Sequence, residues 1–335
     1  MTATRTRAGG TAVSAIPAGR RLAKAVGSRY AIVGLWGLMV LAFTLAAPGQ
    51  FLSTGTFQTI FGEQQAYVFL MLALICTLAV GEFDLSIASM LGLAATLVPV
   101  FAVVHHLNIV LACVLAAAAC AAAGLVNAVL VVVVGINPIV VTLGMATLLE
   151  GIALWASGMG TVGGLSLADA KVANTQFLSL PLSFYYGLAL TAIFAYIMSF
   201  TPLGRYMTFV GANREVARLA GIKVRRIRMG AFIAAGLICG AGGVIAVVGL
   251  GGYDPTSSAT YLLPAFAATF LGTAIVLPGR FNPAGGFIAV YFLVTGIVGL
   301  QLLGYAGWIS DFFFGLSLIV AVAAATVVRR RQVGA

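Results

Sequence analysis

The chain has 335 residues, of which 61% are hydrophobic and only 8% are charged, and its formal net charge is +10. A soluble domain carries roughly 25% charged residues, so this composition excludes a soluble fold and makes lipid the solvent for most of the surface. The positive charge does not indicate a nucleic-acid partner. It is concentrated between apolar runs, as in the cytoplasmic loops of membrane proteins, where it also suits contact with membrane lipid.

The apolar runs predict an all-α integral membrane protein with about ten transmembrane helices, some of them short or broken. The predicted spans are 30–47, 65–80, 84–104, 107–134, 137–156, 182–200, 229–250, 261–277, 283–303 and 308–328. The first span is expected to be a retained helix and not a signal peptide, because about 29 polar or small residues precede it. Residues 30–328 then form a single transmembrane domain between basic cytoplasmic tails at 1–29 and 329–335.

The basic residues also predict the orientation of these spans. If the N-terminus is inside and the chain crosses ten times, every one of the 18 lysine and arginine residues except Lys171 lies on the cytoplasmic side. This excess places both termini and the segment 201–228 in the cytoplasm. The largest outer segment, 157–181, is rich in small and polar residues and is expected to be a surface loop.

The few acidic residues near the spans are candidates for function, because a charge at the centre of a membrane helix costs about 2.5–3.5 kcal/mol. Glu82 and Asp84 follow a second span that is short unless it starts earlier, near Phe57. A short span followed by glycine and acids indicates a broken helix beside a translocation path. Asp84 equally suits the N-cap of the next helix. Glu150, in the fifth span, either lines the path or bonds a neighbouring helix.

The central basic segment predicts a short cytoplasmic helix. Asn213 suits its N-cap, Glu215 its first turn and Gly221 its C-terminal end. Two interpretations of this helix remain open. It lies on the lipid surface, held by its arginines, or it docks a cytoplasmic protein.

Four segments, taken in order and spacing, resemble a known family. Residues 81–89 (GEFDLSIAS), 137–144 (NPIVVTLG), 204–224 and 231–252 are similar to motifs of the ribose-type (monosaccharide) permease family of bacterial binding-protein-dependent ABC importers. The chain departs from the family pattern at Glu82, where a small residue is usual, and at Ala88, where glycine is usual. It also lacks the paired glycines expected at 271–280. These changes bear on the substrate more than on the fold.

The resemblance implies a permease subunit in the bacterial plasma (inner) membrane that moves a small sugar or polyol-like solute into the cytoplasm by alternating access. It implies three partners: a second permease subunit, which is either another copy of this chain or a related chain, cytoplasmic ABC ATPase subunits and an extracytoplasmic solute-binding protein. The expected pathway residues are Glu82, Asp84, Ser86, Asn137, Thr142 and Glu150. The expected ATPase-coupling residues are Gly211, Asn213, Arg214, Glu215, Ala217, Arg218, Leu219 and Gly221.

We expect no enzymatic activity, cofactor or metal on this chain, with ATP and magnesium held by the partner ATPase. None of the three lysines, Lys24, Lys171 and Lys223, follows a glycine, so the chain has no Walker A motif. A membrane enzyme such as a lipid-modifying transferase would need a catalytic constellation, and the sequence presents none. The alternative transport mechanism is a proton-coupled secondary carrier that uses Glu82, Asp84 and Glu150.

Overall fold

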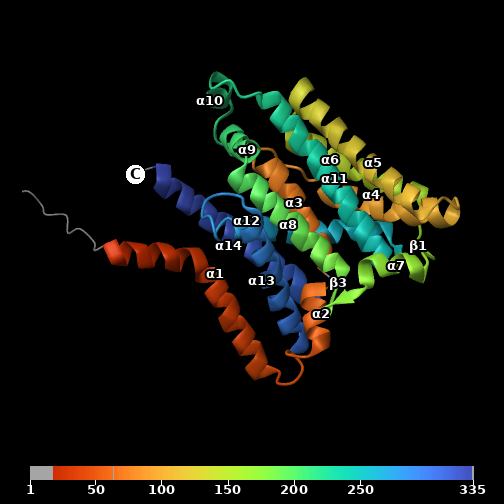
Figure 1. The fold of residues 1–335 in the computed structure, drawn as a ribbon, viewed down its shortest axis with the longest axis horizontal. Coiled ribbons are helices and arrows are strands. Elements are labelled where there is room, and N and C mark those ends of the chain that lie inside the picture. The colour runs from red at the N-terminus through yellow and green to blue at the C-terminus, as the bar shows by residue number, and fades with distance from the viewer. Residues whose placement is uncertain (1–17, 63, 334–335) are drawn as a thin grey trace, which may run out of the picture.

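The computed structural model describes the backbone of residues 18–62 and 64–333, which form a helical membrane protein with a few two-residue strands (Figure 1). The first half contains α1 (Ala18–Ala46), α2 (Thr54–Gly62), α3 (Gln65–Leu78), α4 (Ile87–Pro99), α5 (Ile109–Ala128) and α6 (Pro138–Ala156). Helices α4 and α5 continue into π-helical turns, η1 (Val100–Val104) and η2 (Val129–Val134). The second half contains α7 (Leu167–Asn174), α8 (Leu182–Phe200), α9 (Pro202–Ala212), α10 (Arg214–Leu219), α11 (Val224–Leu250), the 3-10 helix η3 (Pro255–Tyr261), α12 (Leu262–Gly272), α13 (Pro283–Leu302) and α14 (Trp308–Val333).

Seven helical segments among the described residues are long and apolar enough to cross a membrane. Two shorter apolar helices, Ala31–Ala46 and Trp308–Ala323, lie within α1 and α14. The predicted all-α membrane protein is therefore confirmed. The count of ten spans and the cytoplasmic position of both termini stay predictions.

Several predicted boundaries differ from the observed ones. The region of the second span is helical before residue 65 as well, because α2 (Thr54–Gly62) precedes α3 (Gln65–Leu78), and α3 ends before the predicted end at residue 80. The eighth span is shorter than predicted, since α12 ends at Gly272 and residues 273–282 are not helical. The N-terminal basic tail lies outside the described residues up to position 17, and α1 includes its remainder from Ala18. Of the C-terminal tail, only residues 334–335 lie outside, because α14 extends to Val333.

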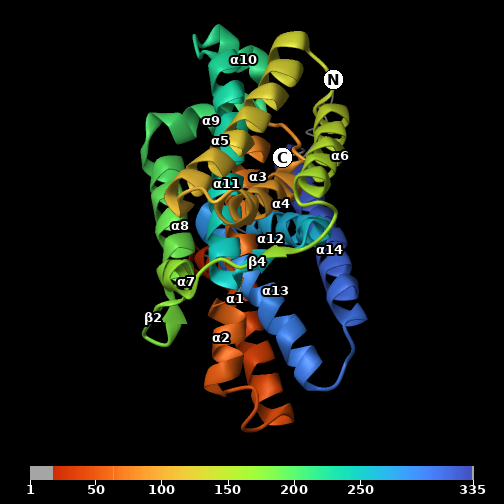
Figure 2. The same cartoon turned by 90° about the vertical axis from the view of Figure 1, so that its right-hand side faces the viewer.

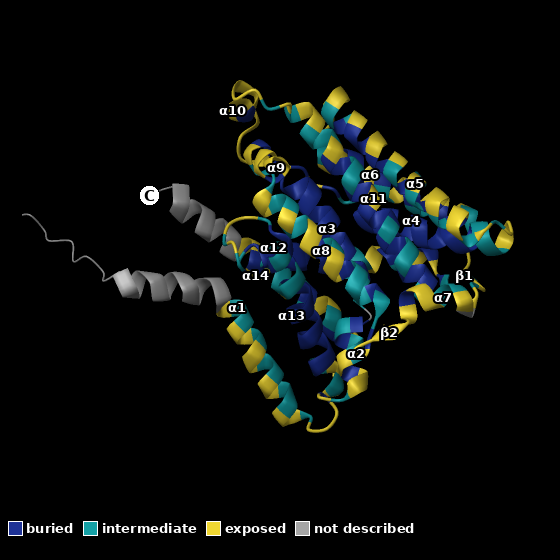
Figure 3. Ribbon diagram, in the orientation of Figure 1, coloured by how far each residue is buried: buried dark blue, intermediate teal, exposed yellow. Residues whose placement is uncertain are grey.

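The core lies around α3 and α4, in which nearly every residue is buried (Figure 3). Helix α11 packs against α3, α4 and α5, and α13 packs against α12, α3 and α8. Helices α5 and α6 lie on one side of this centre, and α1 and α14 lie on the other (Figure 1). Helices α10 and α2 lie at opposite ends of the molecule (Figure 2). These outer helices expose many large apolar side chains, as expected where lipid replaces water as the solvent.

Small residues set the close packing of α11 on α5. A Cβ atom added at Gly236 would lie 2.4 Å from the carbonyl oxygen of Cys120, and one at Gly124 would lie 2.5 Å from that of Phe232. Contacts this short require glycine, because membrane helices associate through backbones that approach closely.

The segment 157–181 has more structure than the predicted surface loop. It contains α7, whose N-cap Ser166 accepts a hydrogen bond from the Asp169 amide at 3.2 Å and donates one to the Asp169 carboxylate at 2.7 Å. It also contributes three short strands, β1 (Val162–Gly163), β2 (Gln176–Phe177) and β3 (Leu180–Pro181). Strand β1 pairs antiparallel with β4 (Gly252–Tyr253), and β2 pairs antiparallel with β3.

Candidate functional site

The site is centred on the linker between α3 and α4. Helix α3 ends in a Schellman motif, in which the Gly81 amide donates to the Leu78 carbonyl and the Glu82 amide donates to the Thr77 carbonyl, each at 3.0 Å. Gly81 has φ +77°, a left-handed conformation that costs glycine little. The chain therefore turns sharply and carries Glu82 into the protein, where its side chain is fully buried.

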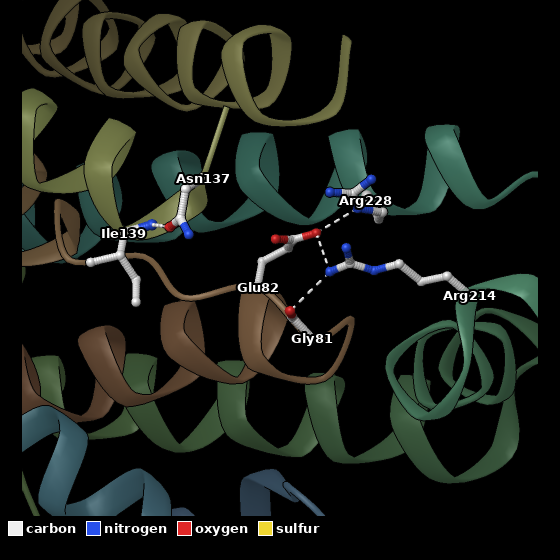
Figure 4. Close-up of polar contacts among 6 residues, drawn as sticks. All are labelled: Gly81, Glu82, Asn137, Ile139, Arg214 and Arg228. Carbon is white, nitrogen blue, oxygen red and sulfur yellow. Dashed lines mark hydrogen bonds and ion pairs between the residues drawn. The ribbon is translucent and has the colours of Figure 1, made fainter. Parts of the chain in front are cut away.

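Two arginines from distant parts of the sequence bind this carboxylate (Figure 4). Arg214 Nη2 lies 2.7 Å from Glu82 Oε1 and donates a second hydrogen bond, of 3.0 Å, to the Gly81 carbonyl. Arg228 Nε lies 2.5 Å from the same Oε1 atom. Arg214 is the first residue of α10 and Arg228 lies in the first turns of α11. A buried carboxylate is costly unless it is paired, and here it is paired twice.

Asp84 organises a second group of buried polar side chains. Its Oδ1 atom accepts hydrogen bonds from the Ser86 amide at 2.9 Å and from the Ser86 hydroxyl at 2.6 Å. Asn127 of α5 donates to that hydroxyl at 2.9 Å. The predicted N-cap role of Asp84 is wrong in detail, because Ser86 is the N-cap residue of α4. Asp84 lies two residues further out and bonds the cap residue itself.

The remaining predicted pathway residues belong to α6 or precede it. Thr142 is buried and accepts a hydrogen bond of 3.0 Å from the Leu85 amide. Glu150 accepts one of 3.1 Å from the Ser89 hydroxyl. Asn137 is exposed and caps α6 by accepting from the Ile139 amide at 2.9 Å (Figure 4). Five of the six predicted residues therefore meet along the linker and the facing side of α4, whereas Asn137 takes a capping role nearby.

The short central helix forms with the predicted caps. Asn213 accepts hydrogen bonds from the Glu215 amide at 3.0 Å and the Val216 amide at 3.1 Å, and α10 ends before Gly221. One side of the helix is open, with Leu219 84% exposed and Val216 48% exposed. Arg218 and Glu215 form an exposed ion pair of 2.7 Å within the helix. This surface combines exposed apolar side chains with charged ones.

The opposite side of α10 is attached to the protein. Ala217 is completely buried in a small apolar cluster with residues from α9, α11 and the end of α3. The members of this cluster are Ala79, Val80, Met207, Val210, Ala217 and Ala231. Gly211 packs so closely on α3 that an added Cβ atom would lie 2.2 Å from the Ala79 carbonyl oxygen. We call α9, α10 and the first turns of α11 the docking unit.

The acidic residues of the segments between helices have local roles. Asp254 is the N-cap of η3 and accepts hydrogen bonds from the Thr256 amide and hydroxyl at 2.9 and 2.8 Å. These hydrogen bonds hold the pKa of Asp254 below its usual range. Among the described residues, no group of three or more histidine, cysteine or acidic side chains is placed to bind a metal.

The sequence did not identify Arg228, Asn127 or Ser89 as members of the site. Arg228 was one of many arginines in the central basic segment, and Asn127 and Ser89 lie within apolar runs. A polar residue inside an apolar span is a signal that could have found Asn127, because such side chains usually bond another helix.

The apolar spans and the buried polar linker between α3 and α4 describe a helical membrane protein. The chain belongs to the permease family described as the permease component of the branched-chain amino acid transport system, which matches residues 59–322. The predicted membership of the monosaccharide-type permeases of binding-protein-dependent ABC importers is thereby confirmed. The chain is thus a transport subunit of an ABC importer.

Curated relatives support the same assignment. The chain is 31% identical over 261 residues to the autoinducer 2 import system permease protein LsrD of Salmonella typhimurium, covering 75% of this chain and 77% of that protein. It is equally similar to the LsrD protein of Escherichia coli K12, of which it covers 78%. No solved structure matches the chain.

Proposed function

We propose that this chain moves a small sugar or polyol-like solute into a bacterial cytoplasm, through alternating access driven by a separate ABC ATPase. The observation that carries the proposal is the docking unit. Helix α10 has one side anchored in the apolar cluster and the other side exposed, and the exposed side includes Leu219, the last residue of the helix. A short, capped helix of this kind suits a groove on another protein, because exposed apolar anchors surrounded by charge are typical of binding surfaces.

The solute path is proposed to run beside the α3–α4 linker. Asp84, Ser86 and Thr142 are completely buried there, and the Asp84 Oδ2 and Asn127 Oδ1 atoms have no hydrogen-bond partner among the described residues. Buried acceptors inside a membrane protein are costly unless they are used, and solute hydroxyls would supply donors when the path opens. The relatives are named for autoinducer 2 import and the family for branched-chain amino acids, so both compounds belong in a substrate screen.

The assembly is proposed to contain two permease subunits, two ATPase subunits and an extracytoplasmic solute-binding protein. This chain would lie in a bacterial inner membrane, with both of its termini on the cytoplasmic side. ATP and magnesium would be held by the ATPase. Closure of the ATPase pair would move the docking units and switch the permease between outward- and inward-open states.

A proton-coupled carrier is the weaker alternative. Glu82 faces two guanidinium groups and Glu150 bonds Ser89, so both carboxylates already have structural partners. Such a carrier would also have no use for an exposed docking helix.

The test is co-purification with the ATPase encoded beside this chain. We expect the unaltered chain to retain the ATPase, and a chain with residues 213–221 replaced by a glycine–serine linker to lose it. A milder pair separates docking from folding. Leu219→Ser should weaken retention, whereas Leu250→Ser, which changes an exposed leucine at the far end of α11, should not. Failure of the unaltered chain to retain any ATPase would refute the proposal.

A further inference from the structure

The proposed function leaves open how movement of the docking helix would reach the buried linker. We infer that Glu82 is a positioning residue that joins the two, and that its ion pair with Arg214 transmits ATPase-driven movement to the α3–α4 linker. This inference rests on the proposed function, because it requires an ATPase at α10. Glu82 and its two arginine partners are shown together in Figure 4.

One carboxylate oxygen ties three elements together. Glu82 Oε1 accepts hydrogen bonds from Arg214 of α10 and Arg228 of α11, and the Glu82 amide caps the C-terminal end of α3. Arg214 adds a hydrogen bond to the Gly81 carbonyl, so it binds the terminal turn of α3 as well as the side chain. A displacement of α10 therefore pulls directly on residues 81 and 82.

The two arginines differ in exposure, and this difference assigns their roles. The Arg228 side chain is 15% exposed and that of Arg214 is 43% exposed. Arg228 is the less exposed partner, and it keeps Glu82 paired when Arg214 moves. Arg214 reaches the surface at the start of the docking helix, so it is able to move with a bound protein while Glu82 keeps one counter-charge.

Packing in the same region makes the connection stiff. The Gly211 backbone lies against the Ala79 carbonyl, and Val80 and Ala217 belong to the same buried cluster. Interiors packed this closely transmit small displacements instead of absorbing them. The ion pair and the packing contact are independent observations that place the docking helix on the last turn of α3.

The α3–α4 linker then transmits the movement to the buried polar side chains around Asp84. Only Phe83 separates Glu82 from Asp84, which bonds Ser86, and the Leu85 amide donates to Thr142 of α6. A shift at Glu82 thus reaches side chains of α4, α5 and α6 within a few residues of the chain.

Cysteine labelling on the linker tests the inference. Phe83 is 42% exposed, so a Phe83→Cys chain offers a thiol that reports the linker's position. We would assemble this chain with the ATPase and measure the rate of reaction with a small maleimide, with and without ATP and vanadate. The chain without Phe83→Cys gives the background from the native cysteines. We expect nucleotide to change the rate at least threefold.

Arg214→Gln should remove most of this nucleotide-dependent change, and Arg280→Gln is the matched control. Arg280 is exposed, lies outside α9, α10 and α11, and forms no ion pair among the described residues, so its substitution should preserve the change. Glu82→Gln should act like Arg214→Gln, because each substitution removes the ion pair between Glu82 and Arg214. The loss in the double variant should therefore be no greater than in either single variant. Co-purified ATPase should be retained in all of them.

Three results would overturn the inference. The first is an undiminished nucleotide effect in the Arg214→Gln chain, and the second is an equal loss in the Arg280→Gln chain. The third is the absence of any nucleotide effect at position 83 when Glu82 and Arg214 are unaltered. Loss of the ATPase from the unaltered chain is a different outcome, because it refutes the proposed function itself.

Discussion

Gly211→Ala is expected to loosen the packing of the docking unit against the end of α3. The new Cβ atom would lie 2.2 Å from the Ala79 carbonyl oxygen, and such atoms do not approach closer than about 3.0 Å, so the backbones must separate by about 0.8 Å. Overpacking of this kind costs about 1–3 kcal/mol. Alanine recovers up to about 1 kcal/mol through its helix propensity. We therefore expect a net loss of about 1–2 kcal/mol of unfolding free energy.

Gly230→Ala is the matched control. Gly230 lies within α11, and an added Cβ atom would meet nothing within 4 Å. Alanine there should be neutral or should stabilise by up to about 1 kcal/mol. Thermal unfolding of the two purified variants in the same detergent, beside the unaltered chain, measures the difference. Equal stability of the Gly211→Ala and Gly230→Ala chains would refute the close contact between Gly211 and Ala79.

The other predictions concern single side chains. Arg228→Gln should destabilise the protein by about 3 kcal/mol, because it removes the less exposed of the two arginines that pair with the buried Glu82 carboxylate. Arg226→Gln, at an exposed position, should change stability by less than about 0.5 kcal/mol, and thermal unfolding of both variants checks this. Asn213→Ala should cost α10 about 1 kcal/mol and weaken ATPase retention in a pull-down, and unchanged retention would count against docking at α10. Asp84→Ala should lower stability by about 1–3 kcal/mol through loss of the acceptor for Ser86, and an unaltered melting temperature would contradict the buried hydrogen bonds.

Much of the fold could be predicted because the bilayer imposes a simple rule. Helices that cross lipid need long apolar runs, and those runs are visible in the sequence. The α10 helix was equally predictable, since Asn213 and Gly221 are strong local signals for helix ends. The eighth span was overestimated because its apolar run continues to Leu277, whereas α12 ends at Gly272. Apolar character alone does not distinguish a helix from buried irregular backbone.

The ion pairs around Glu82 could not be predicted from a single sequence. The acidic residues near the spans were recognisable as unusual, but their partners lie 132 and 146 positions away in the sequence. Nothing local distinguishes Arg214 and Arg228 from the other arginines of the central segment. The packing of Gly211 on Ala79 is likewise a tertiary contact, set by how α9 folds back on α3. The predicted pathway role of Glu82 stays untested, and its observed partners add a role in positioning.

The most direct test of the central claim is transport in proteoliposomes. The chain would be reconstituted with its ATPase and binding protein, and uptake of labelled ribose, other pentoses, hexoses, polyols, leucine and autoinducer 2 would be followed with ATP supplied on the ATPase side. The account predicts uptake of at least one of these solutes that requires ATP hydrolysis and persists when a protonophore removes the proton gradient. Uptake by the chain alone, driven by a proton gradient without ATP or the ATPase, would contradict it.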